Sequence, residues 1–152
     1  MKVEEILKKQ NVLFDLQGTK KEEVIGEISQ KLAHAGFVAD AEVFLASVLE
    51  RETHATTGIG NAIAIPHGKS TTVTESTIVF ARTSQDIEWE SLDDQPVNLL
   101  ILLAISDADK TDGHLRLLSE IATKLMDDDI VAALKEATTP EAVLTILSKG
   151  DE

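Results

Sequence analysis

The chain has 152 residues, 27 acidic against 14 basic side chains, no cysteine and 3% aromatic residues. A hydrophobic fraction of 43% with 27% charged residues is typical of a folded globular protein and not of a disordered one. The lack of cysteine excludes disulfides, cysteine-ligated metals and a cysteine nucleophile, and the net charge of −13 disfavours nucleic acid and anionic membranes as partners.

The sequence carries no recognisable targeting or membrane-spanning segment. The first ten residues, MKVEEILKKQ, lack the unbroken apolar run of a signal peptide. The longest apolar run, residues 97–105, is far shorter than the ~20 residues that a spanning helix needs. With no repeat or flexible linker in sight, we expect one domain over residues 1–152, located in the cytoplasm with no direct membrane insertion.

Helical patterns dominate the N-terminal part of the chain. A short amphipathic stretch over residues 3–9 leads into an expected strand at residues 12–16. Residues 19–22, Thr-Lys-Lys-Glu, have the pattern of a capping box and predict the start of a helix that stops at Gly36. Asp40 is expected to cap a second helix.

The hydrophobic period changes in the middle of the chain. Residues 62–66 alternate alanine and isoleucine before a proline, which predicts a short strand that ends there. Residues 76–82 and 97–105 predict further strands, and the second is apolar enough for the centre of a sheet. The polar stretch between them, residues 85–95, is expected to form a loop or hairpin connection.

The C-terminal third returns to helical patterns. Thr111 or Asp112 is expected to cap one helix, residues 127–129 to open a second, and residues 139–141 to open a third with proline at its first position. The expected order is a strand, two helices, three strands and three helices. Such interleaving predicts an α/β fold, a three-layer α/β/α sandwich with a central mixed sheet.

The most unusual segment is residues 51–69, RETHATTGIGNAIAIPHGK. A dinucleotide fingerprint fails here, because it needs a strand before it, a helix after it and a third glycine where Ile63 stands. A P-loop ending in residues 68–70 fails too, because its first glycine would also fall on Ile63. We therefore expect no nucleotide cofactor.

His67 stands between Pro66 and Gly68. The proline is expected to end the strand and aim the next side chain outward, and the glycine to leave room for a partner or a phosphate. A neutral imidazole with an ordinary pKa of about 6.5 is available as a nucleophile, and a phosphoryl group on histidine stays activated for a second transfer. An isolated histidine is more often structural, so the flanking pattern carries this prediction.

That pattern closely resembles enzyme IIA of the fructose–mannitol class, type 2, of the bacterial sugar phosphotransferase system, and most of all its fructose branch. The resemblance lies in TGIGNAIAIPHG at residues 57–68, preceded by LERE at residues 49–52. It continues in WESLDDQPV at residues 89–97 and HLRLLSEIA at residues 114–122. Residues 20–36 also look like the first helix of the family, so the similarity spans essentially the whole chain.

The resemblance implies a phosphotransferase with a phosphohistidine intermediate. His67 would accept a phosphoryl group from the carrier protein HPr. It would then pass the group to a cysteine of the IIB component, which phosphorylates a fructose-type sugar during uptake through the membrane component IIC. No cofactor and no metal are expected, because the donor is already a phosphohistidine.

The resemblance also implies which residues surround the phosphate. His114, expected in the first turn of a helix, would orient the phosphoryl group and share its charge. Arg51 would bind phosphate oxygens through its guanidinium. Beside these, the loop residues Thr56, Thr57 and Asn61 are candidates to hydrogen-bond the histidine or the phosphate, although each equally fits ordinary turn chemistry. Asn61 stands where glutamate is frequent in the family, and Ala62 where glycine is frequent.

Several alternatives remain open at the level of sequence. A regulatory module of the same fold, such as a nitrogen-type IIA, would use phosphorylation of His67 to control a partner protein. A hydrolase with His67 as general base lacks a paired serine or cysteine nucleophile. Zinc held by His54, His67 and His114 lacks metal-ligand spacing, and residues 127–129 lack the pattern of a calcium loop. His34 and His54 receive no role.

Overall fold

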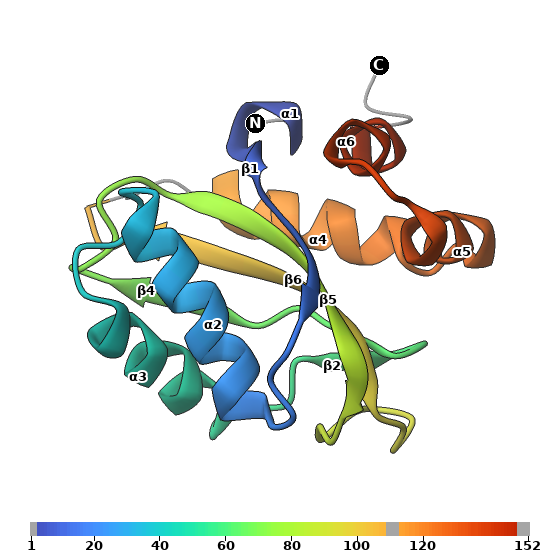
Figure 1. Cartoon of the computed structure of the whole chain (residues 1–152), viewed down its shortest axis with the longest axis horizontal. Helices are drawn as coiled ribbons and strands as arrows, with labels where there is room; N and C mark the ends of the chain where they lie inside the picture. The colour runs from blue at the N-terminus through green and yellow to red at the C-terminus, as the bar shows by residue number, and fades with distance from the viewer. Residues whose placement is uncertain (1–2, 109–112, 149–152) are drawn as a thin grey trace.

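The structure, a computed structural model, describes residues 3–108 and 113–148, and the side chains of residues 5–108 and 116–148. Two layers of helices enclose a twisted sheet (Figure 1). The elements in chain order are α1 (Val3–Ile6), β1 (Leu7–Leu16), α2 (Lys21–His34), α3 (Ala41–Glu52), β2 (Gly58–Gly60), β3 (Ile63–Ala64), β4 (His67–Ser70), β5 (Thr77–Ile87), β6 (Val97–Ser106), α4 (Gly113–Lys124), α5 (Asp128–Glu136) and α6 (Pro140–Ser148).

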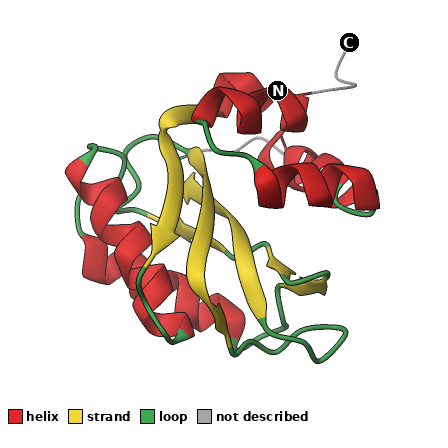
Figure 2. Ribbon diagram, turned by 45° about the vertical axis from the view of Figure 1, so that its right-hand side comes forward, coloured by secondary structure: helices red, strands yellow, loops and turns green. Residues whose placement is uncertain are grey.

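The sheet is mixed, with the order β1-β5-β6-β3-β2 and with β4 also paired to β6. β5 runs antiparallel to β6, whereas β3 and β4 both run parallel to β6. β3 pairs with residues 99–100 and β4 with residues 103–106, so the two short strands follow each other along one side of β6. Helices α2 and α3 lie on one face and α4, α5 and α6 on the other (Figure 2). The predicted three-layer α/β/α sandwich with a central mixed sheet is confirmed.

β6 is apolar without interruption over residues 99–105, as expected for a central strand with both faces buried. Leu99, Ile101 and Leu103 belong to the core shared with the C-terminal helices, while Leu100 and Leu102 belong to the core under α2 and α3. Within the part of the chain that the structure describes, no helix has both the length and the apolarity to cross a bilayer.

Most of the expected helix boundaries are confirmed. The carboxylate of Asp40 accepts hydrogen bonds from the first turn of α3, and that of Asp127 does so for α5. The hydroxyl of Thr139 accepts a bond from the N–H of Ala142 at 3.1 Å, with proline at the first position of α6. Gly36, with φ 88°, follows the end of α2 as expected. The expected cap at residues 111–112 lies outside the described residues.

The capping box predicted at residues 19–22 is wrong. Lys20 is the N-cap of α2 and makes no side-chain capping bond. The N–H and the hydroxyl of Thr19 instead donate to Glu23 Oε1 at 2.9 Å and 2.8 Å, one residue beyond the expected partner Glu22. The helix consequently begins one residue later than the pattern predicts.

The expected strands differ from the structure mainly at their ends. The first strand begins at Leu7 instead of residue 12, directly after the short helix α1, and β5 continues to Ile87. The strand expected to end at Pro66 does not end pairing there, because β4 resumes pairing with β6 at His67. A proline lacks the N–H donor but keeps its carbonyl, and the carbonyl of Pro66 accepts the N–H of Leu103 at 3.0 Å.

Candidate functional site

His67 is the first residue of β4, directly after the two-residue break that separates β3 from β4. Its backbone is paired opposite Leu103 of β6, and its imidazole is half-buried. The ring is therefore held by the centre of the sheet and still reaches solvent.

Gly68 brings α3 close to this strand. A Cβ at this position would come within 2.8 Å of Val48 Cγ2 and 3.2 Å of Phe44 Cε1. The expectation that Gly68 leaves room for a phosphate is wrong, because α3 fills that space. The close packing instead sets the last turn of α3, which carries Arg51, beside His67.

Arg51 and His67 meet directly. The Nε–H of Arg51 donates to His67 Nε2 at 2.9 Å, and His67 Nδ1 lies 3.4 Å from the carbonyl oxygen of Ile65. Since the guanidinium can only donate, Nε2 is the acceptor nitrogen and Nδ1 carries the proton. Arg51 is itself held by a bond from Nη1 to the carbonyl oxygen of Ala55 at 3.2 Å.

The surroundings keep the imidazole neutral. Burial is the first cause that lowers the pKa of His67, and the charge of Arg51 lowers it further. The bond to the carbonyl of Ile65 acts in the opposite direction and raises this pKa by less. A neutral ring with its lone pair on Nε2 is the nucleophilic form.

Thr57 is buried and connects to the site of Arg51 and His67 through hydrogen bonds. Its hydroxyl donates to Glu52 Oε1 at 2.9 Å, while its carbonyl accepts the N–H of Ile65 at 2.9 Å. The structure thus connects Thr57 to the site through its backbone, with the hydroxyl committed to Glu52. Glu52 received no role from the sequence, although it stands next to Arg51.

Asn61 lies in the tight turn between β2 and β3. Asn61 and Ala62 both have positive φ, 57° and 66°. The side chain of Asn61 is exposed, and its N–H donates to Asp93 Oδ2 at 3.2 Å. The segment after β5 covers the same hairpin, since the N–H of Leu92 donates to the carbonyl of Gly58 at 3.1 Å. The described contacts of Asn61 are with this segment and not with His67.

The other histidines differ in position. His114 is the second residue of α4, and its side chain lies outside the described part of the structure. His34 and His54 are exposed. Among the described side chains, no three histidine or carboxylate groups converge in a way that could hold a metal ion.

These contacts define what the site can do chemically. A neutral imidazole offers one lone pair at Nε2, the other nitrogen is tied to a backbone carbonyl, and a guanidinium stands 2.9 Å from the nucleophilic atom. Arginine binds phosphoryl oxygens with charge-assisted bonds. The arrangement suits a histidine that accepts and releases a phosphoryl group.

The chain matches the family described as "Phosphoenolpyruvate-dependent sugar phosphotransferase system, EIIA 2" over residues 5–150. It therefore belongs to the type-2 EIIA domains of this system, the fructose–mannitol class. Proteins of this class are phosphocarrier domains, and phosphoryl transfer in their system passes through a phosphohistidine.

Two relatives carry fructose-specific names. The "PTS system fructose-specific EIIABC component" of Bacillus subtilis is 35% identical over 152 residues, which is 100% of this chain but only 24% of that protein. The "PTS system fructose-specific EIIA component" of Haloferax volcanii is 36% identical over 129 residues, covering 85% of this chain and 83% of the relative. The chain thus spans about a quarter of the first relative and most of the second.

Two solved structures share the fold. The nitrogen regulatory protein IIA-Ntr of Neisseria meningitidis superposes with a TM-score of 0.84 at 28% identity, covering 94% of this chain and 97% of the other. The complex of enzyme IIAMTL with phosphorylated enzyme IIBMTL from Escherichia coli superposes with a TM-score of 0.74 at 23% identity, covering 93% and 96%. Relatives with transport names and with regulatory names therefore both resemble this chain.

Proposed function

We propose that His67 is the residue that carries the phosphoryl group, on Nε2. The observation that carries this proposal is the 2.9 Å bond from Arg51 Nε to His67 Nε2, which identifies the nitrogen with the lone pair and places a cation beside it. A bond forms between Nε2 and phosphorus as the nitrogen–phosphorus bond of the donor breaks. The proton on Nδ1 stays on the ring, directed at the carbonyl of Ile65.

Arg51 then exchanges its acceptor. In the unphosphorylated protein its Nε–H donates to the lone pair of Nε2. After phosphorylation this lone pair forms the bond to phosphorus and can no longer accept a hydrogen bond. The same N–H is then beside the phosphoryl oxygens and binds the charge that develops there during transfer. The predicted contacts of His114 and Asn61 with the phosphoryl group remain part of the proposal, whereas Thr57, whose hydroxyl donates to Glu52, takes part through the bond of its carbonyl to the N–H of Ile65.

We further propose that the chain receives its phosphoryl group from HPr and delivers it to a IIB component in fructose-type uptake, with IIC as the membrane partner and the cytoplasm as the place of exchange. The names of the Bacillus subtilis and Haloferax volcanii relatives support the fructose branch. The fold of the mannitol enzyme, solved with phosphorylated IIB, supports IIB as a partner. The match to IIA-Ntr keeps a regulatory role as the second candidate.

Phosphorylation from purified HPr tests the assignment of His67. With enzyme I, phosphoenolpyruvate and HPr, the wild type should acquire an acid-labile phosphoryl group with the phosphorus NMR signal of an Nε2-phosphohistidine. His67→Ala should acquire none, and His34→Ala, which alters an exposed histidine, should match the wild type. A phosphoryl group that persists in His67→Ala would refute the assignment.

A second assay separates transport from regulation. The phosphorylated protein is mixed with fructose-type and mannitol-type IIB domains, and the label on the IIB cysteine is followed with time. Rapid transfer to a fructose-type IIB supports the transport function. Stable label with every IIB domain would favour the regulatory alternative.

A further inference from the structure

Glu52 is a carboxylate that the fold buries at some cost. Its side chain is 4% exposed, Oε1 accepts the hydroxyl of Thr57 and lies 3.8 Å from Lys21 Nζ, and Oε2 has no hydrogen-bond partner. Burial raises the pKa of Glu52, while Thr57, Lys21 and the indole of Trp89 partly offset this. The indole N–H faces the carboxylate but makes no hydrogen bond of normal geometry. A buried carboxylate with an unpaired oxygen is unfavourable for stability, which points to a role of Glu52 other than stabilising the fold.

The bond from Thr57 to Glu52 closes the loop that leaves α3. Glu52 is the last residue of this helix, and Thr57 directly precedes β2, so the bond joins the two ends of residues 53–56. The carbonyl of Ala55, within this loop, accepts the Nη1–H of Arg51. The closed loop therefore helps to orient the guanidinium that meets His67.

The same bond also leads to the other side of the imidazole. The carbonyl of Thr57 accepts the N–H of Ile65, and the carbonyl of Ile65 lies 3.4 Å from His67 Nδ1. A shift of Thr57 would move Ile65 with it and weaken the contact that keeps the proton on Nδ1. One buried side-chain bond thus supports both the donor to Nε2 and the acceptor for Nδ1.

We propose that Glu52 is a positioning residue for phosphoryl transfer, which acts through Thr57 on both Arg51 and the tautomer of His67. This inference rests on the proposed function of His67. Glu52 touches neither the imidazole nor the incoming group, so its effect must appear in the geometry and the protonation of the ring. Small displacements of a reacting group reduce rates by about 10- to 100-fold.

The experiment compares Thr57→Val with Thr57→Ser. Valine keeps the shape of threonine but lacks the hydroxyl, and serine restores the hydroxyl. We expect Thr57→Val to accept the phosphoryl group from HPr about 10- to 100-fold more slowly, and Thr57→Ser to recover most of the rate. In nitrogen NMR of the unphosphorylated protein, the Nδ1–H form of His67 should predominate in the wild type and in Thr57→Ser, and a mixture of tautomers should appear in Thr57→Val.

Changes at Glu52 test the partner of this bond. Glu52→Gln keeps an oxygen that can accept the hydroxyl of Thr57 and should retain the tautomer, whereas Glu52→Met should reproduce the effect of Thr57→Val. Thr77→Val is the matched control, because Thr77 is also buried and its hydroxyl donates to the carbonyl of Ile6, the last residue of α1. This control should lose stability with no change in the imidazole signals of His67.

Two results would overturn the inference. One is folded Thr57→Val with the wild-type tautomer and the wild-type rate, and the other is an equal change of tautomer in Thr77→Val. If Glu52→Met does not fold, Thr57→Val tests the same bond alone. Failure of the proposed function would give a different result, because the wild type itself would then acquire no label from HPr. The comparison of tautomers does not depend on phosphorylation and would still decide the role of Glu52.

Discussion

The imidazole of His67 has a lowered pKa because it is buried beside the charge of Arg51. The unfolded chain takes up a proton on this residue near the ordinary pKa of about 6.5, whereas the folded protein does so only at lower pH. As the pH falls below about 6.5, the unfolded state therefore binds more protons than the folded state does, and the wild type should lose stability.

Comparison with His67→Gln isolates this effect. The unfolding free energy of the wild type minus that of His67→Gln should decrease between about pH 8 and pH 5.5, since the other histidines are common to both proteins. Urea titrations at several pH values measure the difference. Arg51→Gln should raise the pKa of His67 in NMR titrations. A difference in stability that is independent of pH would contradict a lowered pKa of His67 in the folded protein.

Ala62 occupies a backbone conformation that favours glycine. Its φ of 66° follows the 57° of Asn61 in the turn between β2 and β3, and a left-handed conformation costs an L-residue other than glycine about 1–2 kcal/mol. After the greater entropy loss of glycine is subtracted, Ala62→Gly should stabilise the protein by about 1 kcal/mol in urea unfolding. Ala64→Gly, two residues later in extended and buried β3, should instead destabilise it by about 1 kcal/mol or more. Equal effects at the two positions would contradict this account.

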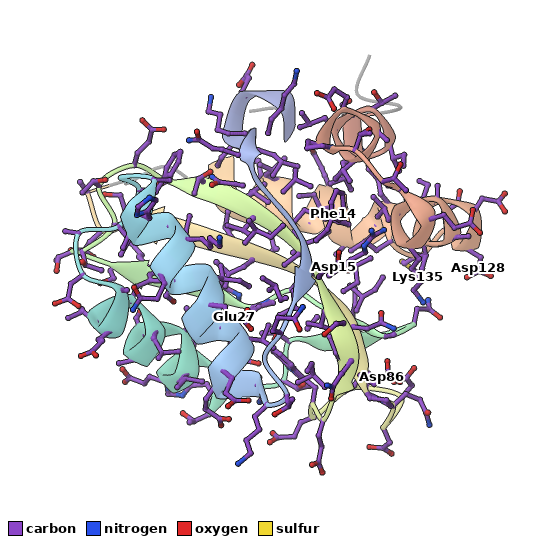
Figure 3. All side chains as sticks on the ribbon, in the orientation of Figure 1. Phe14, Asp15, Glu27, Asp86, Asp128 and Lys135 are labelled. Atoms are coloured by element: carbon purple, nitrogen blue, oxygen red, sulfur yellow. The ribbon has the colours of Figure 1, made fainter. Side chains whose placement is uncertain are left out.

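At the level of elements, Arg82 connects the sheet to the C-terminal helices. It lies on β5 with its guanidinium 4.4 Å from the ring of Phe14 on β1. Its Nη1 donates to the carbonyls of Leu134 and Lys135 in the last turn of α5, at 3.1 Å and 2.8 Å. Phe14 and Lys135, both labelled in Figure 3, lie on the same side of β1. Arg82 therefore caps α5 and fixes it against the sheet.

Arg82→Met should destabilise the protein by about 2 kcal/mol, because two hydrogen bonds from a charged group and a cation–π contact are lost. The control Arg116→Met removes an exposed arginine and should change the unfolding free energy by less than about 0.5 kcal/mol. Urea unfolding measures both variants. Equal losses would show that the cationic charge, and not its contact with α5, is what matters.

The elements also show what local sequence signals can predict. Asp40, Asp127 and Thr139 act within one helical turn, so their sequence neighbours suffice to predict them. The prediction at Thr19 failed because Glu23 competes successfully with Glu22 for the same donor. The continuation of pairing at His67 could not be seen in the sequence, because it depends on β6, more than thirty residues further along the chain.

For the whole molecule, the site was predictable only in part. The resemblance pointed to His67 and Arg51, which the fold places 2.9 Å apart. Glu52 belongs to the LERE segment of the resemblance, but its burial was not predicted, because glutamate at a helix end is ordinarily exposed. Its burial depends on Lys21 and Trp89, which only the complete fold brings to it. A role that depends on burial by residues distant in the sequence cannot be predicted from the local spacing of residues.

The acidic charge also acts on the whole molecule. Acidic side chains number 27 and basic ones 14, so at least 13 carboxylates can have no cationic partner of their own. Like charges held close together in the folded protein repel one another more than in the extended chain. The Debye length falls from about 30 Å at 0.01 M salt to about 8 Å at 0.15 M, which is shorter than most distances across the molecule.

The urea midpoint at pH 7 should therefore rise as sodium chloride is increased over this range. A triple variant alters three exposed positions, with Glu75→Lys, Glu120→Lys and Glu136→Lys. Each substitution changes the charge by +2, so the net charge goes from −13 to −7. The triple variant should start from a higher midpoint at low salt and gain less from added salt, because less repulsion remains to be screened. A midpoint that falls with salt, or an equal rise in both proteins, would mean that local ion pairs outweigh the net charge.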